Sequence, residues 1–387
     1  LTLLEEIIPN LKASQQEFEL NILCMYDAKE DADKSFDDLD QVTQTSDNAT
    51  KNLYIQKNKI LFDSNFASYV VEKIKNFNMP FTYTRCVNAA SRAQIKDWAK
   101  TQKWDVTVLD GLHAAVMIDV HDARYGQIIY RAHNVEADLW RQMYEKEKNF
   151  FKKNILKREY ELCARYEKKI ADISAVVFTV SDIDSERFNK LGWGKKIMTL
   201  PIGMSFRGYP LPFSLNESCK ELLFIGRLDW IPNREGLIWF FDHVWPNIKN
   251  DHLKLTLIGS GQTEWLQSYL GDKVELLKNV KDLTPYYQKS HITLIPLFMG
   301  SGTRVKAIEA GSMGRTFVST AIGVEGIPID PHKDYIKAET AEDWVNALKN
   351  LKLDDVWEKS QNLYKTTEVY FEQKNVAAKM LDVISKI

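Results

Sequence analysis

Glycine-rich turns in the second half of the chain are the residues best placed to bind an anion. Each follows a short apolar run typical of a buried strand, and together they contain Gly226, Gly259, Gly261 and Gly302. After the last turn a helical pattern begins near Thr303, and the backbone N–H groups at a helix start bind phosphate oxygens well. We therefore predict a diphosphate site within residues 296–326, and an ordinary strand-to-helix connection remains the alternative.

Two charged side chains near these turns could hold the rest of such a ligand. Arg227 follows Gly226, and a guanidinium matches phosphate oxygens in a forked geometry, although a pair with Asp229 is the alternative. Glu309 lies within the helical pattern, where a carboxylate can accept hydrogen bonds from two ribose hydroxyls or can simply face solvent. None of the turns fits G-x-G-x-x-G or a Walker loop, which disfavours dinucleotide and ATPase functions.

A polar turn in the first half offers a second candidate cluster. His133, Asn134 and Glu136 follow an apolar run that begins at Gln127. A histidine at the carboxyl end of a strand can exchange hydrogen bonds with a sugar hydroxyl near neutral pH, although a single histidine is more often structural. His113 is a weaker second candidate. No histidine or carboxylate pair has the spacing of a metal site, so no metal is expected.

Strand-like and helix-like segments alternate along the whole chain, which predicts mainly parallel sheets with right-handed crossovers. Expected strands are 19–26, 104–110, 127–136, 173–181, 198–206, 221–228, 253–261, 274–280, 291–297 and 316–320. Expected helices are 3–11, 60–75, 91–101 with a Ser91 cap, 137–170 as one helix or two, 182–192, 233–249 with an Asn233 cap, 263–271, 283–290, a helix from 303, and 368–387.

The length of 387 residues predicts two domains. A stretch with prolines and no periodicity, 207–220, marks a linker. We expect a first domain over 1–206, a second domain over 221–367, and a C-terminal helix over 368–387 that crosses back to the first domain. The predicted fold class is α/β, with two Rossmann-like domains facing each other across a cleft and ligands beyond the carboxyl ends of the strands.

The composition excludes several functional classes. Lys plus Arg (51) and Asp plus Glu (53) nearly cancel, which argues against a nucleic-acid partner. The four cysteines stand far apart, so neither a zinc site nor a disulfide framework is indicated and a cytoplasmic protein is expected. No apolar run is long enough to span a bilayer. The basic segment 141–170 can either lie on the inner membrane or pack on its own sheet, with Phe150, Phe151 and Ile155 on its apolar side.

The second half resembles the donor domain of the family-4 retaining glycosyltransferases of GT-B fold, and in particular the branch that builds bacterial surface polysaccharides. The resemblance rests on GRLDWIPNREGLIWFFDHVWPNI, LTLIGSG and VKDLTPYYQKSHITLIPLFMGSGTRVKAIEAGSMGRTFVSTAIGVEGI. In the first half, RAHNVEADLWRQM and VSDIDSERF are similar to the same branch. It implies transfer of a sugar from UDP or GDP to a hydroxyl of a glycan or lipid-linked glycan, without a metal or other cofactor.

The resemblance also implies roles for individual residues. Arg227 would hold the donor diphosphate, together with the backbone amides of Gly302, Thr303 and Arg304. Glu309 would bind the ribose. The base would lie between the turn at Gly259 and Gly261, with Gly226 nearby, and the segment around Val280, and His133 would lie over the transferred sugar.

Three departures from the family pattern bear on these roles. Ser301 occupies the first position of the Glu-x7-Glu motif, so contacts to the donor sugar are in doubt. The lysine that accompanies the arginine in much of the family is absent from PNREG, where Arg234 is a weak substitute. The family's first strand and its glycine loop would precede Leu1. A nucleotide-sugar epimerase of the same fold and a catalytically decayed glycan-binding or assembly protein remain as alternative functions.

Overall fold

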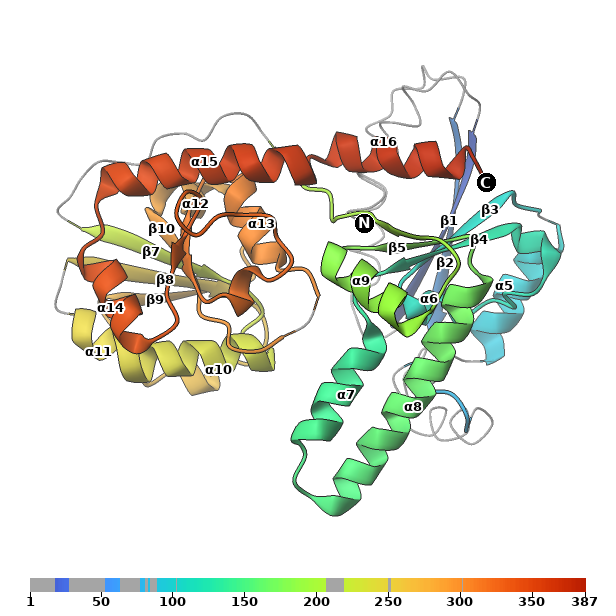
Figure 1. The fold of residues 1–387 in the computed structure, drawn as a ribbon, viewed down its shortest axis with the longest axis horizontal. Helices are drawn as coiled ribbons and strands as arrows, with labels where there is room; N and C mark the ends of the chain where they lie inside the picture. Colours follow the sequence, from blue (N-terminus) through green and yellow to red (C-terminus); the bar gives the residue numbers. More distant parts are fainter. Residues whose placement is uncertain are drawn as a thin grey trace. The chain divides into compact units, whose positions relative to one another are not determined.

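The computed structural model describes residues 18–27, 53–62, 77–80, 83, 89–101, 103–206, 219–249, 252–300 and 302–387 of the chain. They form two compact units, each described here by itself (Figure 1). The first unit comprises Leu1–Gly203 with Lys374–Ile387, and the second comprises Met204–Gln373. Some expected features lie outside the described residues: the helix at 3–11, most of the helix at 60–75, most of the linker, and Ser301.

Six parallel strands form the sheet of the second unit, in the order β12-β11-β10-β7-β8-β9. They are β7 (Lys220–Ile225), β8 (Leu253–Gly259), β9 (Val274–Lys278), β10 (Ile292–Ile295), β11 (Phe317–Ser319) and β12 (Ile336–Lys337). With β7 counted first, this is the strand order of a dinucleotide-binding fold. The order reverses between β7 and β10, and ligands in such sheets bind beyond the carboxyl ends of the strands at that point.

Helices cover both faces of this sheet because successive strand side chains point to opposite faces. Leu222 packs in a cluster with Leu237, Phe240 and Trp344, whereas its neighbour Leu223 packs in the cluster on the other face. The first face is covered by α10 (Ile231–Trp239), α11 (Trp245–Ile248) and α14 (Ala341–Lys349), and the second by α12 (Thr284–Lys289), α13 (Val305–Ser312) and the later part of α15 (Leu353–Phe371). Figure 1 shows α10 and α15 on opposite sides of the strands.

The first unit contains a parallel sheet of four strands in the order β3-β4-β5-β6. They are β3 (Val106–Asp110), β4 (Gln127–Ala132), β5 (Val176–Thr179) and β6 (Ile197–Thr199), and a separate parallel pair is formed by β1 (Phe18–Asp27) and β2 (Leu53–Phe62). The last helix, α16 (Gln373–Ile384), packs on this unit: Val376, Met380 and Val383 share a core cluster with Ile129 and Phe178. Both units are therefore α/β, with the parallel sheets that the alternating pattern predicts.

A serine cap and a left-handed glycine define the two ends of the helix that follows β5. The Ser181 hydroxyl accepts a hydrogen bond from the N–H of Asp184 at the start of α9 (Asp182–Leu191). The helix ends at Gly192, whose left-handed backbone (φ 64°) suits glycine. The helix predicted over 182–192 is thus confirmed.

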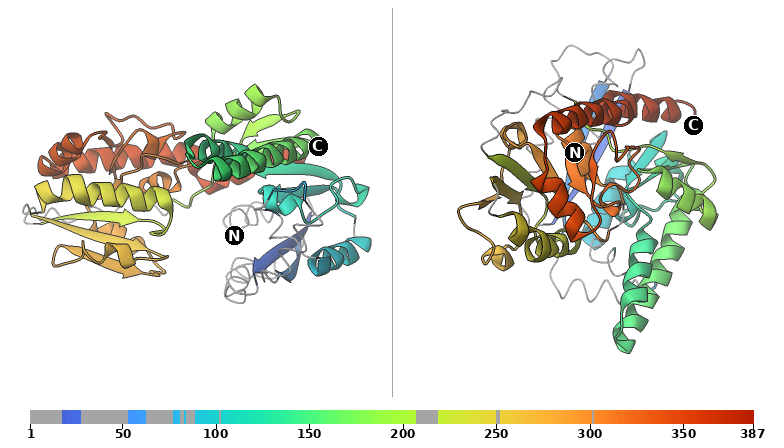
Figure 2. Two further views of the ribbon diagram at one scale, coloured as in Figure 1. Left: turned by 90° about the horizontal axis from the view of Figure 1, so that it is seen from below. Right: turned by 60° about the vertical axis from the view of Figure 1, so that its left-hand side comes forward.

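The basic segment forms two helices, α7 (Glu136–Lys146) and α8 (Phe150–Ile173), which pair as a hairpin that projects from the sheet of the first unit (Figures 1 and 2). The buried Glu167 carboxylate on α8 accepts hydrogen bonds from the N–H groups of Glu136 and Ala137, and so caps α7. At the far end of the hairpin, Phe150, Phe151 and Ile155 do not form a packed apolar side, because they are exposed.

Several predicted boundaries are corrected by the structure. Residues 60–62 end strand β2 instead of starting a helix, and α5 (Ala89–Lys100) begins before Ser91, which is therefore not its cap. Helix α10 begins at Ile231 because Pro232 suits the first helical turn, so Asn233 lies inside the helix and is buried. Only a short 3-10 turn, Glu264–Leu266, forms within 263–271. The C-terminal helical segment is two helices, α15 and α16, with Glu372 between them.

Candidate active site

The glycine turns after β7, β8 and β10 lie on one edge of the second unit's sheet, because these three strands are parallel neighbours. The first two turns are joined by a hydrogen bond of 2.8 Å from Leu228 N–H to the carbonyl oxygen of Ser260. They approach so closely that a Cβ on Gly259 would lie 2.1 Å from the carbonyl oxygen of Gly226. Glycine is therefore required at position 259 by the contact between the turns.

Arg227 follows β7 on this edge and forms a two-point pair with Asp229. Its Nε and Nη2 atoms donate to the two carboxylate oxygens at 2.7 and 3.2 Å. The hydrogen bond from Arg227 lowers the pKa of Asp229. The pairing that the sequence left open is thus present, yet the Arg227 side chain is 69% exposed and remains accessible to a ligand. A pair this exposed contributes little to stability, so exchanging Asp229 for a phosphate costs little.

A lysine that the sequence reasoning missed, Lys306 on α13, reaches the same edge. Its Nζ atom donates a hydrogen bond of 2.7 Å to the amide oxygen of Asn233 on α10, whose Nδ2 donates to the carbonyl oxygen of Arg227 at 2.8 Å. The ammonium also lies 4.5 Å from the ring centroid of Phe224. Asn233 therefore joins the turn after β7 to the helix that follows β10, which places a second cation at the strand-order reversal.

The environment of Lys306 makes its charge adjustable near neutral pH. Burial of the amine, opposed by the Glu309 carboxylate and aided by the charge of Arg304, lowers the pKa of Lys306 to about 7. A negatively charged ligand would favour the protonated amine and raise this pKa again.

A pocket of about 190 Å³ lies beside Lys306. It is bounded by the start of α10 and by the loop between β10 and α13, and its lining residues are Trp230, Pro232, Asn233, Leu297, Met299, Gly300, Thr303, Arg304, Val305 and Lys306. The pocket therefore lies beyond the carboxyl end of β10, on the side that faces β7. This is the position at which doubly wound sheets bind ligands.

The loop that precedes α13 is held in place by the side chain of Arg304. This buried guanidinium donates to the carbonyl oxygens of Gly300 and Ile322 at 3.1 and 2.8 Å, and pairs with Glu325 at 3.1 Å. Gly302 has a left-handed backbone (φ 76°), which favours glycine. Helix α13 begins at Val305, later than predicted, so Gly302, Thr303 and Arg304 form its N-terminal approach.

Glu309 and Tyr287 form the part of the site deeper along α13. Burial raises the pKa of Glu309, while its hydrogen bond with the Tyr287 hydroxyl and the charge of Lys306 act in the opposite direction. Val280 follows β9 and packs, partly buried, against the cluster that contains Tyr287. Gly261 lies after β8 with φ 94°, and a Cβ there would collide with the Asp229 carboxylate.

In the first unit, four side chains gather at the carboxyl ends of β3 and β4. The Asp110 carboxylate pairs with His133 Nε2 at 2.7 Å and with Arg131 Nη1 at 2.8 Å. Burial works to raise the pKa of Asp110, but the His133 hydrogen bond and the positive charges of Arg131 and His133 lower it overall. Burial and the charge of His133 lower the pKa of His113, against the charge of Asp110. His133 and His113 therefore belong to one electrostatic cluster.

The other two acceptor-side candidates have different environments. The amide oxygen of Asn134 is buried and has no hydrogen-bond partner among the described residues. Burial raises the pKa of Glu136, whose carboxylate has a hydrogen bond with the Tyr83 hydroxyl. Glu136 thus faces the interior near Tyr83 and Glu167, and the structure does not bring it together with His133 in a direct contact.

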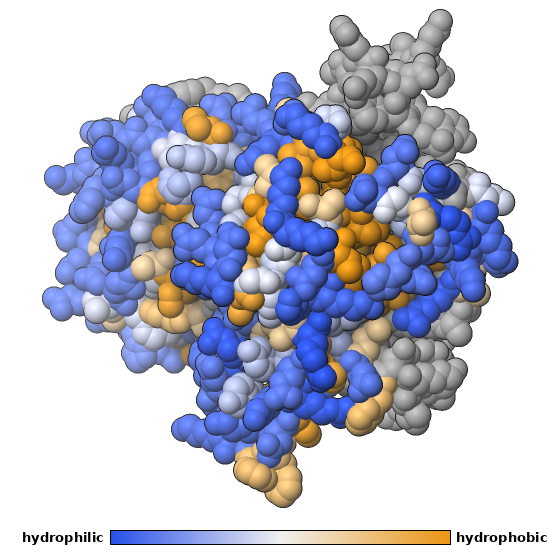
Figure 3. Space-filling model, turned by 45° about the vertical axis from the view of Figure 1, so that its right-hand side comes forward, coloured by the Kyte–Doolittle hydropathy of each residue, from blue (hydrophilic) through white to orange (hydrophobic). Residues whose placement is uncertain are grey.

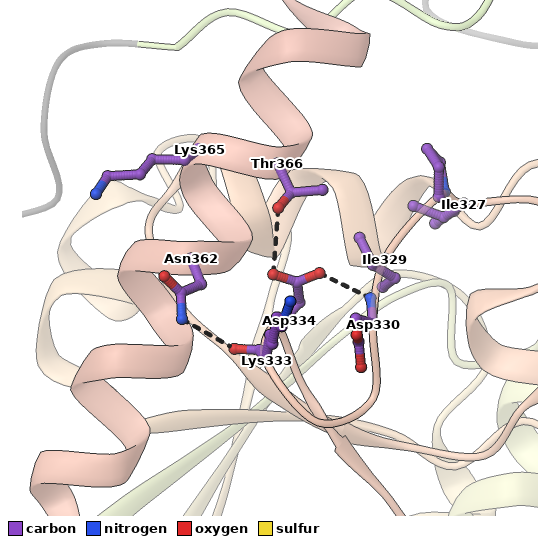
Figure 4. A pocket seen from close by; sticks show the side chains of 9 residues that line it. Ile327, Ile329, Asp330, Lys333, Asp334, Asn362, Lys365 and Thr366 are labelled. Atoms are coloured by element: carbon purple, nitrogen blue, oxygen red, sulfur yellow. Dashed lines mark hydrogen bonds between the residues drawn. The ribbon is translucent and has the colours of Figure 1, made fainter.

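A larger pocket of about 500 Å³ lies elsewhere in the second unit (Figure 4). Its polar groups bond to one another: Asp334 accepts from Thr366 Oγ1 at 3.2 Å and from Asp330 N–H at 2.7 Å. Thr316, just before β11, donates to the carbonyl oxygen of Asp334, so this pocket lies near the amino end of that strand. That end is opposite to the ligand-binding edge, and we do not assign the donor to it.

The described residues contain neither a cluster of metal ligands nor a membrane-spanning helix. No three His, Cys, Asp or Glu side chains in this part of the chain lie close enough together to hold a metal ion. No helix within the same residues is long and apolar enough to cross a membrane.

Of the residues that the sequence predicts, Arg227, Glu309 and the glycine turns lie in the second unit and His133 lies in the first, whereas Lys306 and Asp110 were not predicted. Lys306 is four residues after Gly302 and is the second residue of α13, so its side chain stays close to the edge where the helix begins. Asp110 is the last residue of a predicted strand, so the carboxyl-end rule could have identified it. Arg234, the substitute considered for the missing lysine, instead lies over the Trp265 ring at 5.8 Å from its centroid.

Similar proteins support the reading of the second unit. Residues 219–354 match the family model described as glycosyl transferases group 1. A protein of Klebsiella pneumoniae, described as an uncharacterized 44.6 kDa protein in the cps region, is 26% identical over 249 residues. That match covers 61% of this chain and 62% of the length of the Klebsiella protein. The second unit is therefore similar to group 1 glycosyl transferases over residues 219–354. The match to the Klebsiella protein spans less than two thirds of that protein's length.

Solved structures share the fold over nearly the whole chain. Sucrose-phosphate synthase from Thermosynechococcus elongatus has a TM-score of 0.66 and 13% identity, with 96% of this chain and 99% of that chain covered. HepE from Anabaena, solved in complex with UDP and glucose, has a TM-score of 0.65 and 10% identity, with 96% of this chain and 100% of that chain covered. These similarities confirm the α/β fold of GT-B type that the sequence resemblance implies.

Proposed function

We propose that this protein is a retaining glycosyltransferase that moves a sugar from UDP or GDP onto a hydroxyl of a glycan or a lipid-linked glycan. The observation that carries the proposal is the linked set Arg227, Asn233 and Lys306, which presents two cations where the strand order reverses. A nucleoside diphosphate is the ligand class that such an edge suits best, because its charge lies in one compact group.

In this proposal the donor diphosphate lies between the two cations and the start of α13. The Arg227 guanidinium exchanges Asp229 for phosphate oxygens, and Lys306 binds in its protonated form. The amides of Gly302, Thr303 and Arg304 approach the same oxygens at the helix N-terminus. Lys306 thereby supplies the positive charge that a lysine at another position supplies in much of the family. Asn233 holds the Lys306 side chain in place.

The nucleoside would extend along the same edge toward β8 and β9. Glu309 accepts hydrogen bonds from the ribose hydroxyls, in place of its present bond with Tyr287. The base lies between the turn at Gly259 and Gly261 and the segment at Val280. Glycine at position 226 leaves room for Lys306, since a Cβ at this position would lie 3.2 Å from Lys306 Nζ.

The reaction would break the bond between the sugar's anomeric carbon and the phosphate oxygen. The acceptor oxygen attacks from the same face, and the departing diphosphate takes the acceptor's proton. Arg227 and Lys306 stabilise the charge that develops on the diphosphate, so we propose that the transfer needs no metal ion. In the first unit, we assign His133, which is held by Asp110, to a hydrogen bond with a sugar hydroxyl. His113 belongs to the same electrostatic cluster.

We also propose that the protein works in the cytoplasm, at the inner membrane, in the synthesis of a surface polysaccharide. The similarity to a protein of the Klebsiella pneumoniae cps region motivates this assignment. A lipid-linked acceptor would itself be anchored in the membrane.

The test is the release of nucleoside diphosphate by the full chain from a panel of UDP and GDP sugars, with a lipid-linked glycan as acceptor. We expect release from one donor, and the product's anomeric configuration, read by NMR, should match that of the donor. An inverted product would contradict the retaining mechanism. Interconversion of sugars without release would support the epimerase, and donor binding without either reaction would support a decayed binding protein.

A further inference from the structure

The tip of the α7–α8 hairpin, residues 143–157, has an apolar surface that nothing else in the described part of its unit covers. Phe150 and Phe151 are 72% and 78% exposed, Ile155 is 64% exposed, and Met143 on the opposite helix is 45% exposed. Orange and pale-orange side chains lie at the lower end of the molecule in Figure 3, where the hairpin ends. Contiguous exposed aromatic side chains mark interaction surfaces.

Hydrogen bonds and ring contacts hold the tip in a fixed shape. The exposed side chains therefore lie on an ordered surface. Asn149 caps α8 by accepting hydrogen bonds from the N–H groups of Phe151 and Lys152, both at 3.1 Å. The rings of Phe150 and Phe151 pack edge to face with centroids 5.8 Å apart. Below the tip, Tyr144 and Tyr160 stack across the two helices with centroids 6.4 Å apart.

Positive charge surrounds this apolar tip. Five lysines lie between residues 144 and 157, against two glutamates: Lys146, Lys148, Lys152, Lys153, Lys157, Glu145 and Glu147. Of the glutamates, Glu145 pairs with Arg141 at 3.4 Å, and Glu147 accepts the N–H of Asn149 at 2.8 Å. The lysines therefore dominate the charge that the tip presents. Their flexible stems let the ammonium groups reach phosphate groups beside a buried aromatic pair.

We infer that the hairpin tip is a membrane-contacting surface, in which Phe150, Phe151 and Ile155 enter the interface of an anionic lipid bilayer and the surrounding lysines bind lipid phosphates. Aromatic side chains favour the boundary between headgroups and acyl chains, and basic residues beside them are attracted to anionic headgroups. A second copy of the chain is a poorer occupant, because a symmetric contact would bring the lysines of both copies together. The inference rests on the proposed function in one respect only, which is the lipid-linked acceptor. It does not involve the donor site.

The test is sedimentation of the full chain with vesicles, either of phosphatidylglycerol and phosphatidylcholine or of phosphatidylcholine alone. We expect binding to the anionic vesicles that weakens with added salt, and at least about tenfold weaker binding to the neutral ones. The double variant Phe150→Ala with Phe151→Ala should lose at least about tenfold in affinity for the anionic vesicles. Lys148→Gln and Lys152→Gln should each lower it about fivefold.

A matched control is the double variant Val369→Ala with Tyr370→Ala on α15, where the two side chains are 70% and 50% exposed. It should bind vesicles as the wild type does. Because all these side chains are exposed, each variant should keep the wild-type thermal unfolding curve and the wild-type affinity for nucleoside diphosphate. These two readouts separate a failure of this inference from a failure of the donor site.

Four outcomes would overturn the inference. The wild-type chain could fail to bind anionic vesicles, or could bind neutral vesicles equally well. The Phe150 and Phe151 double variant could bind as tightly as the wild type. Light scattering could instead reveal a dimer that this double variant loses, in which case a second copy covers the tip.

Discussion

Replacing Lys306 with methionine should abolish a proton uptake that accompanies nucleoside diphosphate binding in the wild-type protein. Burial lowers the pKa of Lys306 to about 7, so the amine is mostly neutral at pH 8 before binding. A bound diphosphate favours the charged amine and raises its pKa. The complex then binds more protons than the free protein does, and affinity must fall as pH rises above 7.

The size of the effect follows from the protonated fraction of the free amine. With a pKa of about 7, roughly a quarter of the amine is protonated at pH 7.5 and about one hundredth at pH 9. If the amine stays protonated in the complex, the affinity for the nucleoside diphosphate falls roughly twentyfold between pH 7.5 and pH 9. Ionisation of the ligand adds little to this pH dependence, because a phosphate group with a pKa of ~6 is already ionised between pH 7.5 and pH 9.

Isothermal titration of the full chain with UDP or GDP, in buffers of different ionisation enthalpy, measures both affinity and proton uptake. We expect close to one proton taken up at pH 8.5 by the wild type and none by Lys306→Met. Lys359→Met is the matched control, because burial also lowers the pKa of Lys359, which bonds to the carbonyl oxygen of His332 on the far side of the unit. Equal pH slopes in the wild type and Lys306→Met would refute the reasoning.

Four further predictions concern the donor edge and the fold. Arg227→Ala should weaken nucleoside diphosphate binding about tenfold or more by titration, while Arg234→Ala, whose side chain lies over Trp265, should not; equal losses would contradict the assignment. Glu309→Gln should weaken binding of the nucleoside diphosphate about tenfold yet leave inorganic pyrophosphate binding unchanged, and a loss for both ligands would argue against a ribose contact. Gly259→Ala should lower the free energy of unfolding by about 1–3 kcal/mol in urea titrations, because its Cβ would lie 2.1 Å from the Gly226 carbonyl oxygen; an unchanged midpoint would show that the turns separate easily. Ser181→Ala should cost about 1 kcal/mol in the same assay through loss of the α9 cap, and Ser385→Ala near the chain end should cost less.

The sequence was sufficient to predict the α/β class and the common edge of the glycine turns. Both follow from local patterns: apolar runs followed by glycine predict buried strands, and parallel strands bring their carboxyl ends together. The strand order of the second unit puts β7, β8 and β10 side by side, as this reasoning requires.

Contacts between distant segments were beyond the sequence patterns. Asn233 has the residue type of a helix cap, but its side chain is buried between the Arg227 carbonyl and Lys306, more than seventy positions along the chain. Phe151 and Ile155 have the four-residue spacing of a packed helix face, yet both are exposed, because the hairpin projects away from the sheet. In each case tertiary placement, and not local preference, decides what the side chain touches.

A crystal structure of the full chain with UDP or GDP bound tests the central claim most directly. The account predicts diphosphate oxygens within hydrogen-bond distance of the Arg227 guanidinium and Lys306 Nζ, with the Arg227 pair to Asp229 opened and the ribose at Glu309. A nucleotide bound elsewhere, such as in the pocket beside Asp334, with the Arg227 and Asp229 pair intact, would contradict it.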